Sequence, residues 1–207
     1  MFHEDFEKRM MGVCKNGYLT SPSKKDIKQY INIMRESGAR KLECNVEDMN
    51  KYQYDHITKT ISWLNRIIGT DSEAFERAVE NNALVKYCAE FYGNVIQPFY
   101  NSCENYLNDA TVNATCYLFK SNAEEKLRKI DNTKKDVAEM LEADNSRMYE
   151  YVKKAKEVKL LTDSLNDVEG YDVYKKRNTV EKRYNEINET TENISSLAVV
   201  GTLNMER

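Results

Sequence analysis

Apolar residues recur along the second half of the chain at alternating steps of three and four, the spacing of a helix face that packs against another helix. We call these positions the hydrophobic seam. They are Leu127, Ile130, Lys134, Val137, Leu141, Asp144, Met148, Tyr151, Ala155, Val158, Thr162 and Leu165. The uninterrupted rhythm predicts one helix from about Ser121 to Glu169.

The same rhythm resumes after Gly170 and runs from Val173 to Ala198. Because glycine commonly ends helices, the pattern predicts an antiparallel coiled-coil hairpin over residues 120–197 that turns at Asp167–Asp172. In such a hairpin, residue n faces about residue 340 − n, and the returning helix covers positions only from about 145 upward. The seam from Leu127 to Leu141 then needs another partner, either the head described below or a second chain.

Two charged residues, Lys134 and Asp144, lie within the seam and are symmetric about position 139. If two chains crossed antiparallel there, each lysine would face the other chain's aspartate, and an opposed pair of this kind fixes orientation. A two-fold dimer is therefore one interpretation, and exposure of both charges to solvent is the other. The dimer would use Lys134, Asp144, Leu127, Val137 and Leu141.

The first 119 residues show shorter helical patterns separated by glycine and proline. Spacing of four predicts a short helix over Phe2–Met10, and Pro22 suits the first position of a second helix that ends at Gly38. The segment Ala39–Cys44 reads equally as a loop or a short strand.

Asn45 is the predicted N-cap of a third helix, which ends at Gly69. A capping box at Thr70 and Glu73 predicts the start of the next helix. The helical pattern continues from there to Pro98, which must kink or break the helix. The inner face of the third helix is predicted to hold Met49, Ile57, Ile61, Leu64 and Ile68.

Composition changes at about residue 119 of the 207: all five cysteines, both histidines, the single tryptophan and both prolines precede this point. With seven glycines and two prolines in all, the chain is poor in helix breakers. The sequence therefore predicts an all-α fold in three parts. These are an aromatic-rich helical bundle over 1–119 (the head), the protruding hairpin over 120–197 and a tail over 198–207.

No apolar run approaches the roughly 20 residues of a bilayer span, and the acidic first residues do not resemble a secretory signal. The cysteines are odd in number and form no C-x-x-C pair, which is typical of free thiols in a reducing compartment. We expect a cytoplasmic protein, with incorporation into a particle or signal-independent export as the alternatives.

Candidate catalytic chemistry is sparse. His3 and His56 are the only imidazoles, neither has neighbours at metal-ligand spacing, and no glycine-rich phosphate loop or nucleophile motif occurs. The sequence predicts a protein that is not an enzyme and holds no cofactor or metal. A site assembled from residues far apart in the sequence would leave no such signature.

Two further groups of residues are candidates for binding. Tyr92, Tyr100 and Tyr106 belong to a tyrosine-rich stretch that suits either a core or a protein-binding surface. A second group, which we call the basic belt, would gather when the predicted hairpin closes and carries nine positive charges against the three of Glu157, Asp163 and Glu181. It consists of Lys153, Lys154, Lys156, Lys159, Lys175, Lys176, Arg177, Lys182 and Arg183.

The sequence thus favours a non-enzymatic structural or protein-interaction protein that binds other proteins, including copies of itself, as in a subunit of a virion or secretion apparatus. The alternative is a regulator or inhibitor of a nucleic-acid machine, because a basic belt attracts phosphates or an anionic membrane surface. A solvated helix flank explains the belt equally simply, and its charge is partly offset by Glu186, Glu189 and Glu192.

Overall fold

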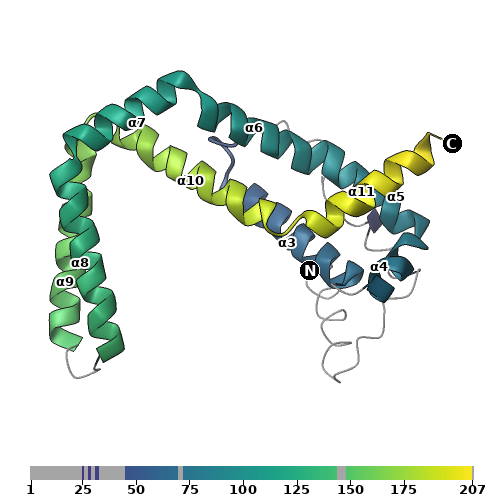
Figure 1. Ribbon diagram of the computed structural model, residues 1–207, viewed down its shortest axis with the longest axis horizontal. Coiled ribbons are helices and arrows are strands. Elements are labelled where there is room, and N and C mark those ends of the chain that lie inside the picture. Colours follow the sequence, from purple (N-terminus) through teal and green to yellow (C-terminus); the bar gives the residue numbers. More distant parts are fainter. Residues whose placement is uncertain are drawn as a thin grey trace. The chain divides into compact units, whose positions relative to one another are not determined.

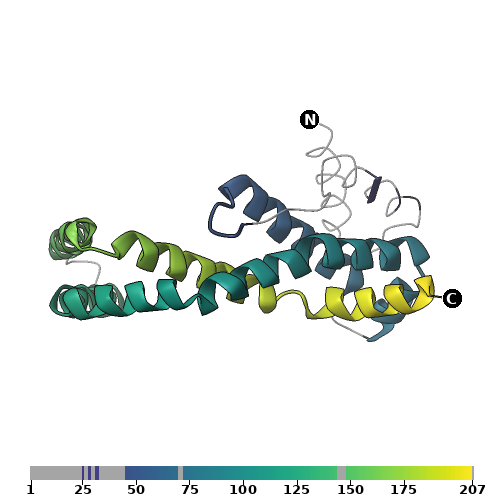
Figure 2. The same ribbon diagram turned by 90° about the horizontal axis from the view of Figure 1, so that it is seen from above.

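A computed structural model of the chain (Figures 1 and 2) describes residues 25, 28, 31–32, 45–69, 72–143 and 148–206. Within these residues every regular element is a helix and no strand occurs, which confirms the all-α fold. The α-helices are α3 (Lys51–Ile68), α4 (Ser72–Val79), α5 (Asn82–Phe91), α6 (Gln97–Asn108), α7 (Ala110–Asn122), α8 (Glu124–Ala143), α9 (Met148–Asp163), α10 (Tyr171–Asn188) and α11 (Glu192–Met205).

Some predictions fall on residues that the structure does not describe. The helix over Phe2–Met10, the segment Ala39–Cys44 and the cap at Thr70 lie outside the described residues. Of the second predicted helix only four residues are described; all four are helical, and Ile31 is buried as its place on the apolar stripe predicts.

The chain forms two compact units. Unit 1 consists of Met1–Cys103 and Arg183–Arg207, and unit 2 of Glu104–Lys182. These limits differ from the predicted division at residues 119 and 197, because unit 1 combines both ends of the chain and unit 2 is the continuous stretch between them.

In unit 1, helix α3 begins one turn later than predicted. Asn50 is the N-cap: its side chain accepts from the Gln53 N–H, and the Gln53 side chain accepts from the Asn50 N–H. Asn45 instead donates to Glu47 and Asp48 in the preceding turn, so the assignment of Asn45 as the cap is wrong. The end at Gly69 is confirmed, with a positive φ of 73° that favours glycine. All five predicted inner-face residues are buried.

Pro98 does not interrupt the chain of helices in unit 1. A π-helix over Tyr92–Ile96 joins α5 to α6, and the N–H of Gln97 donates to the Tyr92 carbonyl five residues earlier. Proline has no N–H and crowds the carbonyl four residues before it, so a locally wider turn accommodates it. The predicted kink or break is therefore a change of helix type.

Helix α11 packs on α5 in unit 1, and both views show the two side by side (Figures 1 and 2). Ile194, Leu197 and Ala198 are buried. A Cβ added to Gly201 would lie 2.8 Å from the Ala89 Cβ and 2.9 Å from the Val85 carbonyl oxygen, so the two backbones approach closely. The residues predicted to form a tail from Ala198 onward thus continue a packed helix as far as Met205.

In unit 2 the chain changes direction between α8 and α9, which form an antiparallel hairpin (Figure 1). The Lys154 ammonium forms an ion pair with Asp136, and the Lys126 ammonium donates to the Ser164 carbonyl at 2.9 Å. The residue numbers of each pair add to 290 instead of about 340. The predicted unbroken helix from Ser121 to Glu169 is therefore wrong, and so is the assignment of Asp167–Asp172 as the tip of the hairpin.

The predicted helix stop at Gly170 is wrong in position: α9 ends at Asp163, and Gly170 lies in the connection that leads into α10 instead of at a hairpin tip. A short 3-10 helix over Ser164–Asp167 follows α9, and Gly170 adopts a φ of 86° just before α10. Helix α10 lies beside α7, where the Phe119 ring contacts those of Tyr171 and Tyr174 at centroid distances of 5.5 and 4.7 Å. The Gly170 backbone lies close to Thr115 and Phe119, leaving little room for a side chain.

Candidate functional site

The described residues contain no group of three or more histidine, cysteine, aspartate or glutamate side chains that could hold a metal ion. Cys88, Cys103 and Cys116 are buried and form no disulfide. Burial raises the pKa of the Cys88 thiol to about 12, so the reactive thiolate is scarce near neutral pH. The cysteines that the structure describes therefore act as small core residues.

The hydrophobic seam of α8 is covered by α9 of the same chain. Ile130 and Leu165 are buried with Phe119 and Ala123, and Leu127 packs half-buried against this cluster together with Val158. Val137, which lies farther along α8 from this cluster, is half-buried. From Leu127 to Val137 the apolar residues of the seam are therefore covered within the chain, by α9 and by Phe119, whereas Leu141 remains 56% exposed.

A groove of about 480 Å³ lies in unit 2, where the pair of α7 and α10 meets the pair of α8 and α9. Its lining includes Lys120, Leu127, Lys134, Thr162 and Tyr171. Lys134 is exposed to solvent at the groove. Asp144, its predicted partner in a two-fold dimer, lies outside the described residues.

Exposed apolar side chains concentrate on the α8–α9 hairpin. Ten large hydrophobic side chains are exposed among the described residues, and half of them belong to this hairpin. Tyr149 is 84% exposed and Leu160 is 71% exposed, although both lie in a well-formed helix. The five are Leu141, Met148, Tyr149, Val152 and Leu160.

The four side chains of α9 among them are exposed because α9 packs on α8 with its opposite face. Tyr151, Val158 and Leu161 are half-buried, whereas Tyr149, Val152 and Leu160 point away from α8. A helix in a two-helix pair can bury only one stripe. We name the outward surface the α9 face, and it comprises Met148, Tyr149, Val152, Lys153, Lys156, Lys159 and Leu160.

The basic belt is divided between two helix pairs. Its α9 members lie on the hairpin with α8, whereas its α10 members in unit 2 lie on the pair with α7 (Figure 1). The expected closure of α9 onto α10 does not occur, because the chain reverses before α9 and not after it. The belt predicted from Lys153, Lys154, Lys156, Lys159, Lys175, Lys176, Arg177, Lys182 and Arg183 is therefore not one surface.

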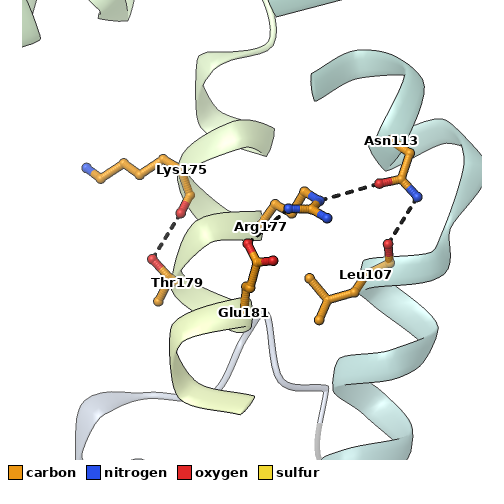
Figure 3. A network of polar contacts seen from close by, with 6 residues as sticks. All are labelled: Leu107, Asn113, Lys175, Arg177, Thr179 and Glu181. Carbon is orange, nitrogen blue, oxygen red and sulfur yellow. Dashed lines mark hydrogen bonds and ion pairs between the residues drawn. The ribbon is translucent and has the colours of Figure 1, made fainter. Parts of the chain in front are cut away.

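Several members of the belt have intramolecular partners. Lys154 pairs with Asp136. Arg177 donates to the Asn113 side chain at 3.4 Å and to Glu181 at 3.1 Å, and Asn113 in turn donates to the Leu107 carbonyl (Figure 3). This network ties α10 to α7, so Arg177 serves the fold. Lys153, Lys156, Lys159, Lys175, Lys176 and Lys182 are exposed.

Arg183 belongs to unit 1 and anchors the segment that precedes α3. Its guanidinium donates to the Met49 carbonyl at 3.1 Å and the Val46 carbonyl at 3.4 Å, and it lies 4.9 Å from the centre of the Tyr54 ring. The Tyr54 hydroxyl donates to Glu186. Burial, then the hydrogen bond to this carboxylate, raises the pKa of Tyr54 above its ordinary value.

The candidate tyrosines fall in different surroundings. The hydroxyls of Tyr100 and Thr191 lie 2.5 Å apart within unit 1, and the Tyr100 ring meets the Tyr184 ring edge-on at 5.5 Å. Tyr92 in unit 1 and Tyr106 in unit 2 are half-buried. Tyr100 therefore contributes mainly to packing within unit 1.

Comparison of the chain with protein-family models, with curated proteins and with solved structures gives no match. No helix among the described residues combines the length and apolar character that crossing a bilayer requires.

Sequence reasoning missed the exposed part of the α9 face. It followed the seam positions and treated the residues between them as a solvated flank. Tyr149, Val152 and Leu160 lie off the seam at spacings of three and eight, which repeat on one face of a helix. A second apolar stripe opposite the first would have been the signal.

Proposed function

We propose that the protein is a non-enzymatic interaction protein that binds another protein through the α8–α9 hairpin, in a structural or assembly role. The observation that carries the proposal is the exposure of Tyr149 and Leu160 on a helix whose packing face is already filled. Four large apolar side chains are exposed on the α9 face, and apolar side chains gathered on one exposed surface mark interaction sites in proteins. Fully burying a large apolar side chain contributes about 1.5–3 kcal/mol, so a few such residues can hold a partner.

The role of a regulator that acts on a nucleic-acid machine has weaker support. It relies on the basic belt, whose two parts lie on separate helix pairs and whose Lys154 and Arg177 are engaged within the chain. Salt dependence separates the two functions. Binding through phosphate contacts weakens steeply as salt rises, whereas binding through apolar side chains persists.

Site-specific photo-crosslinking tests the proposed function. A photoreactive amino acid placed at Tyr149 or at Leu160 should capture the same partner in cells that make the protein. Placed at Lys135, which is exposed on α8, it should not. A product of twice the chain's mass would identify the partner as a second copy.

A matched variant ties the capture to the α9 face. The double change Tyr149→Ser and Leu160→Ser should abolish co-purification of the captured partner while circular dichroism still reports a helical protein. Equal capture at all three positions, or a partner that survives the double change, would contradict a function based on this face.

A further inference from the structure

We infer that the segment bound by the α9 face is an amphipathic helix with acidic residues beside its apolar stripe. This inference rests on the proposed function and specifies the chemistry of the partner. It follows from the order of apolar and charged side chains on α9 and from the faces that a second copy could offer.

The apolar side chains of the α9 face form a line along the helix. Tyr149, Val152, Lys156 and Leu160 follow one another at steps of three, four and four, so they share one side of α9. The line spans about three turns. A helical partner matches this length and straightness with its own stripe of anchors at helical spacing.

The charges within this line are positive. Lys156 lies between the apolar anchors, and Lys153 and Lys159 flank it; all three are exposed. Lys154, in contrast, lies on the side of the helix where it pairs with Asp136. Glu150 and Glu157 lie seven residues apart along one edge of the face and leave its centre basic. A partner that covers the centre must bring carboxylates to the lysines.

A second copy of the hairpin is a poor occupant. Two α9 faces would bring lysines against lysines, and like charges at an interface oppose association. The outward side of α8 carries Lys135, Glu139 and Glu142, all exposed, and so lacks large apolar anchors. A phosphate-bearing partner would satisfy the lysines and leave Tyr149 and Leu160 without a role. An acidic amphipathic helix accounts for both kinds of side chain.

A charge-exchange experiment on the full chain tests the inference. The probes are two labelled peptides of about four helical turns with the same leucine and alanine stripe, one flanked by glutamate and the other by lysine. Fluorescence anisotropy should show that the chain binds the glutamate peptide at least about tenfold more tightly than the lysine peptide.

The variant Lys153→Glu, Lys156→Glu, Lys159→Glu should reverse this preference. A control with the same change in net charge, Lys135→Glu, Lys175→Glu, Lys176→Glu, should keep the preference of the original chain. Equal binding of both peptides by the original chain, or reversal in the control, would overturn the inference.

Vesicles of phosphatidylcholine with or without phosphatidylserine test a membrane as the occupant. Binding to the phosphatidylserine vesicles that depends on the three α9 lysines, without peptide binding, would overturn the inference in favour of a lipid surface. The two proposals can fail separately. If the cross-linked partner is lost in the Tyr149→Ser, Leu160→Ser variant but retained in the α9 lysine variant, the proposed function stands and the acidic helix is wrong.

Discussion

The two units bury their apolar residues in different ways. In unit 1 a helix contacts several neighbours: α5 packs against both α4 and α11, and α3 also packs against both. In unit 2 the helices form pairs, α7 with α10 and α8 with α9. A helix with one neighbour buries one stripe and leaves the rest to solvent, so the paired unit is where apolar binding surface can remain accessible.

The largest effect is expected where unit 2 concentrates its core. Phe119 is fully buried among Ala123, Leu165 and the two tyrosines of α10, so Phe119→Ala should lower the free energy of unfolding by about 3–5 kcal/mol. Its neighbour Leu118 is 60% exposed, and Leu118→Ala should cost no more than about 0.5 kcal/mol. Urea unfolding followed by circular dichroism measures both. Similar losses for the two changes would contradict the pairing of α7 with α10.

A smaller effect is expected from close packing in unit 1. Gly201→Ala must push α11 away from Ala89 and the Val85 carbonyl, at a cost of about 1–3 kcal/mol. The control is Gly93→Ala in the π-helix, where no atom lies within 4 Å of the added Cβ. This change should be neutral or slightly stabilising, since alanine favours helix. Fluorescence of buried Trp63, the only tryptophan, reports unfolding of unit 1.

The third prediction concerns alkaline pH and again unit 1. Because the pKa of Tyr54 is raised in the folded chain, the folded state retains its proton where the unfolded state has begun to lose it. The stabilisation is fully present below pH about 10 and declines as the pH rises further. Tyr54→Phe should show a shallower loss of thermal stability between about pH 9 and 11 than the original chain. Parallel pH profiles would contradict a raised pKa of Tyr54 in the folded chain.

The smallest effect is expected for the ion pair across the hairpin. Lys154→Ala removes the contact with Asp136 on a largely solvated surface, so the loss should stay below about 1 kcal/mol. A double-mutant cycle with Asp136→Ala measures the coupling. A coupling energy of several kcal/mol would mean that the hairpin depends on this pair and not on its apolar seam.

The sequence predicts well the features of a helix that depend on residues close together in the chain. The inner face of α3 follows from helical spacing, and its end at Gly69 follows from the conformational freedom of glycine. Asn45 was wrong as a cap because Asn50, five residues later, could meet the same requirement and also had Gln53 at capping-box spacing.

The position of the chain reversal could not be read from the seam. An antiparallel hairpin keeps the three-four rhythm on both of its helices, so the pattern continues from α8 to α9 as it would in one unbroken helix. The prediction placed the reversal at Gly170 because glycine is the stronger helix-ending signal. Between the two helices the sequence offers only the polar run Asp144–Arg147, which is a weaker turn signal than glycine.

The central claim is that the α8–α9 hairpin binds the partner, and shortening this hairpin tests the claim most directly. The residue numbers of paired positions on α8 and α9 add to 290, so Ile130 and Leu160 are neighbours across the hairpin. Residues 131–159 can therefore be replaced by a short glycine-serine loop that joins these two positions. The Phe119 cluster is retained. We predict that the shortened chain no longer co-purifies with the partner cross-linked at Tyr149, while Trp63 fluorescence is unchanged. Retention of that partner with undiminished affinity would contradict the claim.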